Sequence, residues 1–209
     1  MKILYKVLYA IVWPFFNLLY PTFCIGRENI PDGGALICAN HSAYADPLMM
    51  LYAVKSSVQP RFMAKAELLR IPLLGSLLKA VGVFGVERGK GDAGAVNTAI
   101  HLLKEGDVVL MYPEGTRIKR GRRVRAKSGA IRIALAADKP IVPMFVPQRK
   151  RLFRKNVVVV GRAYKPEVCE SQGHSEYMLA AEDLLERIYS LALTDKSAEK
   201  GLWDISKER

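Results

Sequence analysis

A histidine and an aspartate five positions apart are the first side chains in this sequence that could carry out acid–base chemistry. His41 and Asp46 lie in the stretch CANHSAYADP, directly after the apolar run 35–39. On one helix, residues five apart point about 140° away from each other, so these side chains meet only if the chain turns between them. A histidine whose second nitrogen bonds a carboxylate has a fixed tautomer and can take a proton from a hydroxyl group. The spacing also fits an alternative, in which Asp46 only caps a helix and His41 bonds the backbone.

A second polar segment follows another apolar run. Pro113 follows the run 108–112, and after it come Glu114, Gly115, Thr116 and Arg117. Glycine permits a turn that other residues resist, and the planar guanidinium group of arginine suits a phosphate. We therefore predict an anion-binding turn that ends at Arg117.

Two more apolar runs end in a basic residue. Arg88 follows the run 81–86, and Lys65 follows the short run 61–64. Arg88 could instead form a surface pair with Glu87.

The three cysteines are widely spaced and form no metal-binding pattern. We therefore predict reduced thiols in a cytosol-facing protein, with no metal site.

These polar segments can meet only if the apolar runs before them are neighbouring strands. Short apolar runs alternate with helical patterns, which is typical of α/β proteins. We predict one domain with a central, mostly parallel mixed sheet flanked by helices, and ligands bind at the carboxyl edge of such sheets. Pro47 favours a helix start, which makes Asp46 its natural N-cap. The expected strands are 35–39, 61–64, 81–86, 108–112, 141–146 and 157–160. The expected helices are 47–54, 72–80, 92–104, 128–137 and 175–192.

Residues 1–22 differ in composition from the rest of the chain. The run 7–20 is uncharged and shorter than the roughly 20 apolar residues that a spanning helix needs. Its aromatic rings and the lysines before it suit the headgroup layer. We predict an amphipathic helix that docks on the cytoplasmic face of the cell membrane, whether by shallow insertion or by spanning. Packing on the protein's own core is the alternative. One domain over 23–193 and a polar tail over 194–209 would follow.

The net charge limits the kinds of molecule that we expect the protein to bind. Lys and Arg number 32 against 20 Asp and Glu, a formal net charge of +12, which favours anionic partners. Nucleic acid is disfavoured because the basic run 119–125 has no aromatic rings for stacking on bases. That run could equally be a solvated face. A basic protein that binds a membrane surface without catalysis is the non-enzyme alternative.

Four segments, in this order, resemble a known family. NHSAYADP, VFGVERG, YPEGTR and IVPM resemble the four sequence blocks of the glycerolipid acyltransferases, most closely the bacterial 1-acylglycerol-3-phosphate acyltransferases. The likeness covers roughly residues 24–165. It implies transfer of a fatty acyl group from acyl-CoA or acyl-carrier protein to the sn-2 hydroxyl of lysophosphatidic acid, with no cofactor. The product would be phosphatidic acid, for phospholipid biosynthesis.

The resemblance also implies a role for each candidate residue. His41 would be the general base, and Asp46 would orient it. The sequence has no Gly-x-Ser-x-Gly elbow, which fits direct attack on the thioester. Glu87 and Ile118 depart from the family pattern, so a lyso-ornithine lipid, another lysophospholipid and glycerol-3-phosphate stay open as acceptors. The implied substrate-binding residues are Lys65, Arg88, Glu114, Gly115, Thr116 and Arg117.

Overall fold

The computed structural model describes residues 3–54, 59–87, 93–118, 124–168 and 173–194 of the 209. These residues form an α/β domain with a seven-stranded sheet in the order β1-β7-β6-β2-β5-β3-β4. The strands are β1 (Thr22–Ile25), β2 (Ala35–Ala39), β3 (Arg61–Lys65), β4 (Val83–Val86), β5 (Val108–Met111), β6 (Ile141–Phe145) and β7 (Asn156–Val160). The helices are α1 (Ile3–Leu19), α2 (Asp46–Ala53), α3 (Leu74–Ala80), α4 (Ala93–Lys104), α5 (Gly129–Ala137) and α6 (His174–Ser190).

The sheet is mixed, as the alternation of elements predicted. β6 and β7 pair antiparallel, and the other pairs of neighbouring strands are parallel. The carboxyl ends of β2, β3, β4, β5 and β6 therefore lie along one edge. The predicted polar segments at 40–46 and 113–117 follow β2 and β5, and Lys65 ends β3, so the topology brings them to that edge together.

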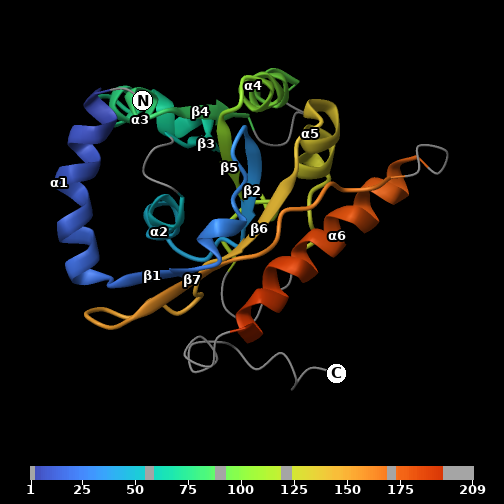
Figure 1. Ribbon diagram of the computed structural model, residues 1–209. Helices are drawn as coiled ribbons and strands as arrows, with labels where there is room; N and C mark the ends of the chain where they lie inside the picture. Colours follow the sequence, from blue (N-terminus) through green and yellow to red (C-terminus); the bar gives the residue numbers. More distant parts are fainter. Residues whose placement is uncertain (1–2, 55–58, 88–92, 119–123, 169–172, 195–209) are drawn as a thin grey trace.

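Both faces of the sheet are covered, which explains why its central strands read as unbroken apolar runs. All five residues of β2 are buried. Ala35, Ile37 and Ala39 pack toward α1 and α2, whereas Leu36 and Cys38 pack toward α4, α5 and α6. Figure 1 shows these two helix layers on either side of the sheet.

Helix α1 is apolar on both its inner and its outer face. Tyr5 and Phe16 are buried, and the ring of Trp13 stacks on that of Tyr52 in α2, with centroids 4.3 Å apart. The outer face is exposed although its side chains are hydrophobic. Among the described residues, no helix is long and apolar enough to cross a bilayer. The exposed outer residues are Ile3, Leu4, Val7, Ile11, Val12, Phe15, Leu18 and Leu19.

Three features of the amino-terminal half differ from the sequence-based expectations. β1 was not predicted; it is only four residues long and pairs with β7, and it begins at Thr22, inside the expected 1–22 segment. The expected strand 81–86 begins later, at Val83, because Val81 and Gly82 end α3 in a turn. Helix α2 begins at Asp46, so Ala45 is its N-cap and Asp46 is not. The predicted tail from residue 195 lies outside the described residues.

Candidate active site

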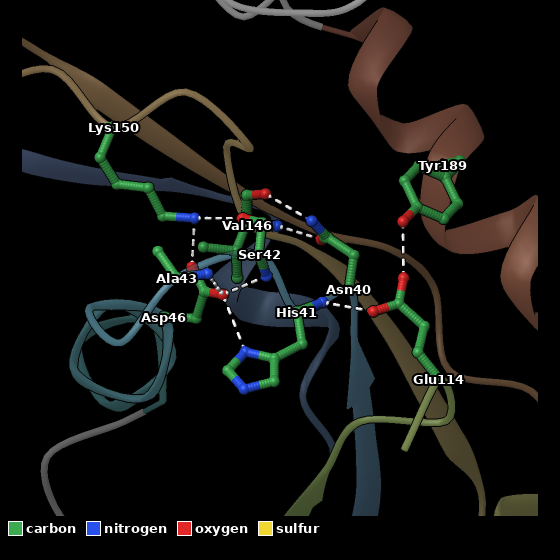
Figure 2. A network of polar contacts seen from close by, with 9 residues as sticks. All are labelled: Asn40, His41, Ser42, Ala43, Asp46, Glu114, Val146, Lys150 and Tyr189. Atoms are coloured by element: carbon green, nitrogen blue, oxygen red, sulfur yellow. Dashed lines mark hydrogen bonds and ion pairs between the residues drawn. The ribbon is translucent and has the colours of Figure 1, made fainter. Parts of the chain in front are cut away.

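The site begins where β2 ends, at a buried asparagine. The side chain of Asn40 donates to the carbonyl of Val146 and accepts from the Val146 amide, both at 2.8 Å. This two-way bond fastens the end of β2 to the end of β6 (Figure 2). It fixes where the chain leaves the sheet, one residue before His41.

The turn after β2 brings His41 and Asp46 together. Asp46 Oδ2 lies 2.9 Å from His41 Nδ1 and accepts the backbone amides of Ser42 at 2.6 Å and Ala43 at 2.8 Å. Pro47 lies in the first turn of the helix, one residue after its start, and the Asp46 side chain folds back over the preceding turn instead of capping α2. Asp46 therefore holds the turn and contacts the imidazole, and the alternative in which it only caps a helix is wrong.

A buried lysine holds the other oxygen of Asp46. Lys150 Nζ forms an ion pair with Asp46 Oδ1 and donates to Ser42 Oγ at 2.6 Å (Figure 2). Burial alone would raise the pKa of Asp46, but the bonds from His41, Lys150 and Ala43 outweigh it and lower the pKa. Asp46 is therefore ionised at neutral pH. An ionised partner requires the proton on Nδ1 of His41, which leaves Nε2 free to accept one.

A second buried carboxylate supports His41 from the opposite side. Glu114 Oε2 accepts the His41 backbone amide at 2.7 Å, and Oε1 accepts the Tyr189 hydroxyl at 2.5 Å (Figure 2). Burial raises the pKa of Glu114 to about 7, although these bonds oppose the shift. Its side chain is closed to solvent. In this structure Glu114 therefore supports the backbone of His41, and its expected contact with the substrate stays a prediction.

The segment after β5 also holds His41 through its backbone and its ring. The Ile118 amide donates to the His41 carbonyl at 2.8 Å. The imidazole stacks on the ring of Tyr112, with centroids 4.0 Å apart and planes 12° apart. Gly115 has a φ of +68°, and a Cβ there would meet the Lys127 side chain at 2.7 Å. The left-handed backbone favours glycine at 115, whereas the flexible end of Lys127 could move aside.

The predicted anion-binding side chains lie at the rim of this site. Thr116 and Arg117 are exposed, and the guanidinium carbon of Arg117 lies 3.7 Å from the ring centroid of Tyr44, which belongs to the turn between His41 and Asp46. Lys65 ends β3 at the same edge of the sheet and pairs with Glu67 at 2.9 Å.

Two basic features predicted from the sequence could not be placed. Arg88 and most of the 119–125 run lie outside the described residues. Among the described residues, no three His, Cys, Asp or Glu side chains group in a way that could hold a metal ion. The expectation that the chemistry needs neither metal nor cofactor stays a prediction.

Sequence reasoning missed three residues of the site: Asn40, Lys150 and Tyr189. Asn40 stood in the quoted motif, and its place between an unbroken apolar strand and His41 was a usable signal. Lys150 sits in a run of basic residues and Tyr189 in an amphipathic helix. Nothing in those local patterns singles out either of them.

Comparisons with known proteins agree with this geometry. A family model described as Acyltransferase matches residues 22–147. A 1-acyl-sn-glycerol-3-phosphate acyltransferase of Bacillus subtilis is 35% identical over 133 residues, 62% of this chain and 65% of the relative. One of Borreliella burgdorferi is 35% identical over 136 residues, 64% of this chain and 54% of the relative. The match thus spans less than two thirds of either relative.

The fold has a solved counterpart. The crystal structure of the 1-acyl-sn-glycerophosphate (LPA) acyltransferase PlsC from Thermotoga maritima superposes with a TM-score of 0.70. The superposition covers 96% of this chain and 81% of that one, at 22% sequence identity. At this identity the likeness establishes the α/β fold.

Proposed function

We propose that this chain, which belongs to the acyltransferase family, transfers a fatty acyl group from a thioester to the sn-2 hydroxyl of 1-acylglycerol-3-phosphate. The product is phosphatidic acid. The observation that carries the proposal is the contact between His41 Nδ1 and an ionised Asp46 at the carboxyl edge of the sheet, beside Arg117. The names of the relatives support this acceptor, and acyl-CoA and acyl-carrier protein are both candidate donors.

The proposed reaction is a direct attack on the thioester. His41 Nε2 removes the proton from the sn-2 hydroxyl while the oxygen of this hydroxyl bonds to the thioester carbonyl carbon. The carbon–sulfur bond then breaks, and the departing thiolate takes the proton back from the imidazolium. A positioned base of this kind contributes about 10² to 10⁴ in rate. Asp46 stays ionised throughout, since its oxygens are held by His41, Lys150 and two backbone amides.

Arg117 supplies the proposed contact with the acceptor's phosphate. One face of its guanidinium group lies against Tyr44, which leaves the N–H donors at its edge for a planar, two-point contact with phosphate oxygens. Thr116 and Lys65 are exposed at the same edge of the sheet. We include both in the proposed acceptor site, together with Arg88, on the strength of the sequence motif.

We further propose that α1 docks the enzyme on the cytoplasmic face of the cell membrane. A helix that is apolar on opposite faces belongs in a core or in lipid, and the outer face of α1 has no protein cover among the described residues. Large exposed apolar surfaces mark interaction sites. Docking would let the acyl chains of a lipid acceptor reach His41 without crossing water.

A panel of acceptors tests the proposed acceptor. Purified protein with lipid vesicles is given lysophosphatidic acid, a headgroup-bearing lysophospholipid, lyso-ornithine lipid or glycerol-3-phosphate, each with acyl-CoA and with acyl-carrier protein. Products are identified by mass. Phosphatidic acid is the expected main product, and a higher kcat/KM for another acceptor would overturn the assignment.

Arginine variants test the phosphate contact. Arg117→Ala should raise the KM for lysophosphatidic acid at least about 10-fold, because a charge-assisted two-point contact is lost. Arg132→Ala is the matched control, since Arg132 also stacks on a tyrosine, Tyr177, but at the opposite face of the sheet. Equal KM values in the two variants would contradict the role of Arg117.

A further inference from the structure

The turn that joins β6 to β7 exposes two apolar side chains among basic ones. Residues 149–155 read RKRLFRK; we call residues 151–155 the β6–β7 tip. At its apex Leu152 is 55% exposed and Phe153 is 66% exposed. Figure 1 shows the turn projecting beside the end of α1. Neither the acyl transfer nor the acceptor site uses these side chains.

The tip is held in one conformation by a buried asparagine. The Asn156 side chain, 2% exposed, accepts the Arg151 amide at 2.8 Å and donates to the carbonyls of Arg151 and Arg154 at 2.9 and 2.8 Å. Phe153 has a φ of +55°, a conformation that bulky residues rarely adopt. The chain thus keeps a strained backbone that presents a large ring to the outside.

The tip is continuous with the exposed face of α1. The Phe153 amide donates to the carbonyl of Leu19, the last residue of α1, at 2.8 Å. Leu18 and Leu19 are exposed, as is Phe23 in β1. Lys155 Nζ lies 5.1 Å from the ring centroid of Phe23. The apolar surface of α1 therefore extends onto the tip, where basic residues border it.

We propose that the β6–β7 tip is a second membrane-contact element, which inserts Leu152 and Phe153 into the headgroup layer of an anionic bilayer. Aromatic rings and long cationic side chains both favour that layer. Basic residues next to an inserted apolar group add attraction to anionic lipid. The combination gives a role to a phenylalanine that is exposed to water and to the sterically disfavoured backbone that presents it.

The same turn connects the bilayer to the active site. Lys150, directly before the tip, is buried against Asp46 and Ser42. Lipid contact at Leu152 and Phe153 would therefore set the depth of the His41 site relative to the membrane surface. The inference shares the bilayer with the proposed function but does not require turnover, so lipid binding tests it separately.

Vesicle binding by the full chain gives the first test. The variant Leu152→Ser/Phe153→Gly should bind vesicles of phosphatidylglycerol and phosphatidylcholine at least about 10-fold more weakly than the wild type. Glycine accepts the φ of residue 153 without strain, so thermal unfolding should show a stable fold. The control is Leu179→Ser, in which a 64% exposed leucine is removed from α6, on the opposite side of the molecule (Figure 1). Unchanged vesicle affinity of the double variant would overturn the proposal.

Photocrosslinking gives a second readout that does not depend on how tightly α1 binds. A benzophenone amino acid at position 153 should form lipid adducts in these vesicles, and the same group at position 179 should not. Arg154→Ser/Lys155→Ser should lose about 5-fold in affinity per charge on anionic vesicles and nothing on pure phosphatidylcholine. Absence of lipid adducts at 153, or a loss confined to binding of acyl-carrier protein, would show that the tip does not contact membrane.

Discussion

Two buried carboxylates hold His41 from opposite sides, and they contact different parts of it. Asp46 contacts the imidazole, and its second oxygen pairs with the ammonium group of Lys150. Glu114 contacts the backbone amide of His41, and its second oxygen accepts a phenol, that of Tyr189. Asp46 therefore fixes the imidazole ring of His41, and Glu114 fixes the backbone of the same residue.

The pKa values of the two acids shift in opposite directions. Both carboxylates are fully buried, and burial raises the pKa of a carboxyl group. Bonds from His41 and Lys150 overcome this at Asp46 and lower its pKa, whereas burial prevails at Glu114 and raises its pKa to about 7. The difference teaches that the His41 bond and the Lys150 ion pair, more than depth, keep Asp46 charged. Its charge can stabilise the imidazolium that it contacts.

Replacement of Asp46 tests the contact between this carboxylate and the imidazole ring of His41. It should have the largest effect. Asp46→Asn removes the charge and can place an N–H opposite Nδ1, which favours the tautomer whose Nε2 cannot accept a proton. We expect kcat to fall by about 10³- to 10⁴-fold. Steady-state kinetics on lysophosphatidic acid checks this. The double variant with His41→Ala should lose little more than either single variant, because the two residues act as a unit; additive losses would contradict a shared role.

Removal of the cation should weaken the fold as well as the chemistry. In Lys150→Met, Asp46 remains fully buried without its ion-pair partner. We expect the free energy of unfolding to fall by about 3–5 kcal/mol, the usual cost of an uncompensated buried charge. Chemical denaturation at pH 7 measures the change. Arg149→Met, an exposed neighbour, should stay within about 0.5 kcal/mol of wild type, and similar values for both variants would refute the structural role of Lys150.

The strands and the His41–Asp46 contact could be predicted from the sequence because their signals are local. Buried parallel strands read as unbroken apolar runs, and parallel pairing puts the residues after them on one edge. β2 accordingly spans the predicted residues 35–39. β1 left no such signal: it is four residues long, with alternating burial, and follows α1 after a two-residue gap. Its pairing depends on β7, more than 130 positions away.

The supports of the site could not be predicted because their contacts are distant in sequence. Tyr189 is 75 positions from Glu114 and Asn40 is 106 from Val146. Lys150 reaches Asp46 only because β6 lies beside β2 in the sheet. The N-cap prediction failed for a different, local reason. The amides of Ser42 and Ala43 compete for the Asp46 oxygen that would otherwise cap α2.

The pH dependence of the free energy of unfolding tests Glu114, the carboxylate that contacts the backbone of His41. The pKa of Glu114 is raised from 4.5 to about 7 by burial, so the folded state keeps a proton that the unfolded state releases. Its stabilising effect is complete below about pH 4.5 and is lost as the pH rises through 7, by about 1.4 kcal/mol per pH unit. Across that window the free energy of unfolding should fall by about 3 kcal/mol in total. This is the smallest of the three expected effects, after those of Asp46→Asn and Lys150→Met.

Glu114→Gln should abolish this particular loss. The amide oxygen can still accept from His41 and the amide nitrogen can donate to the Tyr189 oxygen, so the chain stays supported without a titrating proton. The free energy of unfolding of the variant, minus that of the wild type, should therefore rise by about 3 kcal/mol between pH 4.5 and pH 8, as measured by denaturation at each pH. A constant difference would mean that Glu114 is ionised in the folded protein. Tyr189→Phe removes a bond that lowers the pKa of Glu114, so it should move the end of the wild-type loss to higher pH and leave Asp46 unaffected.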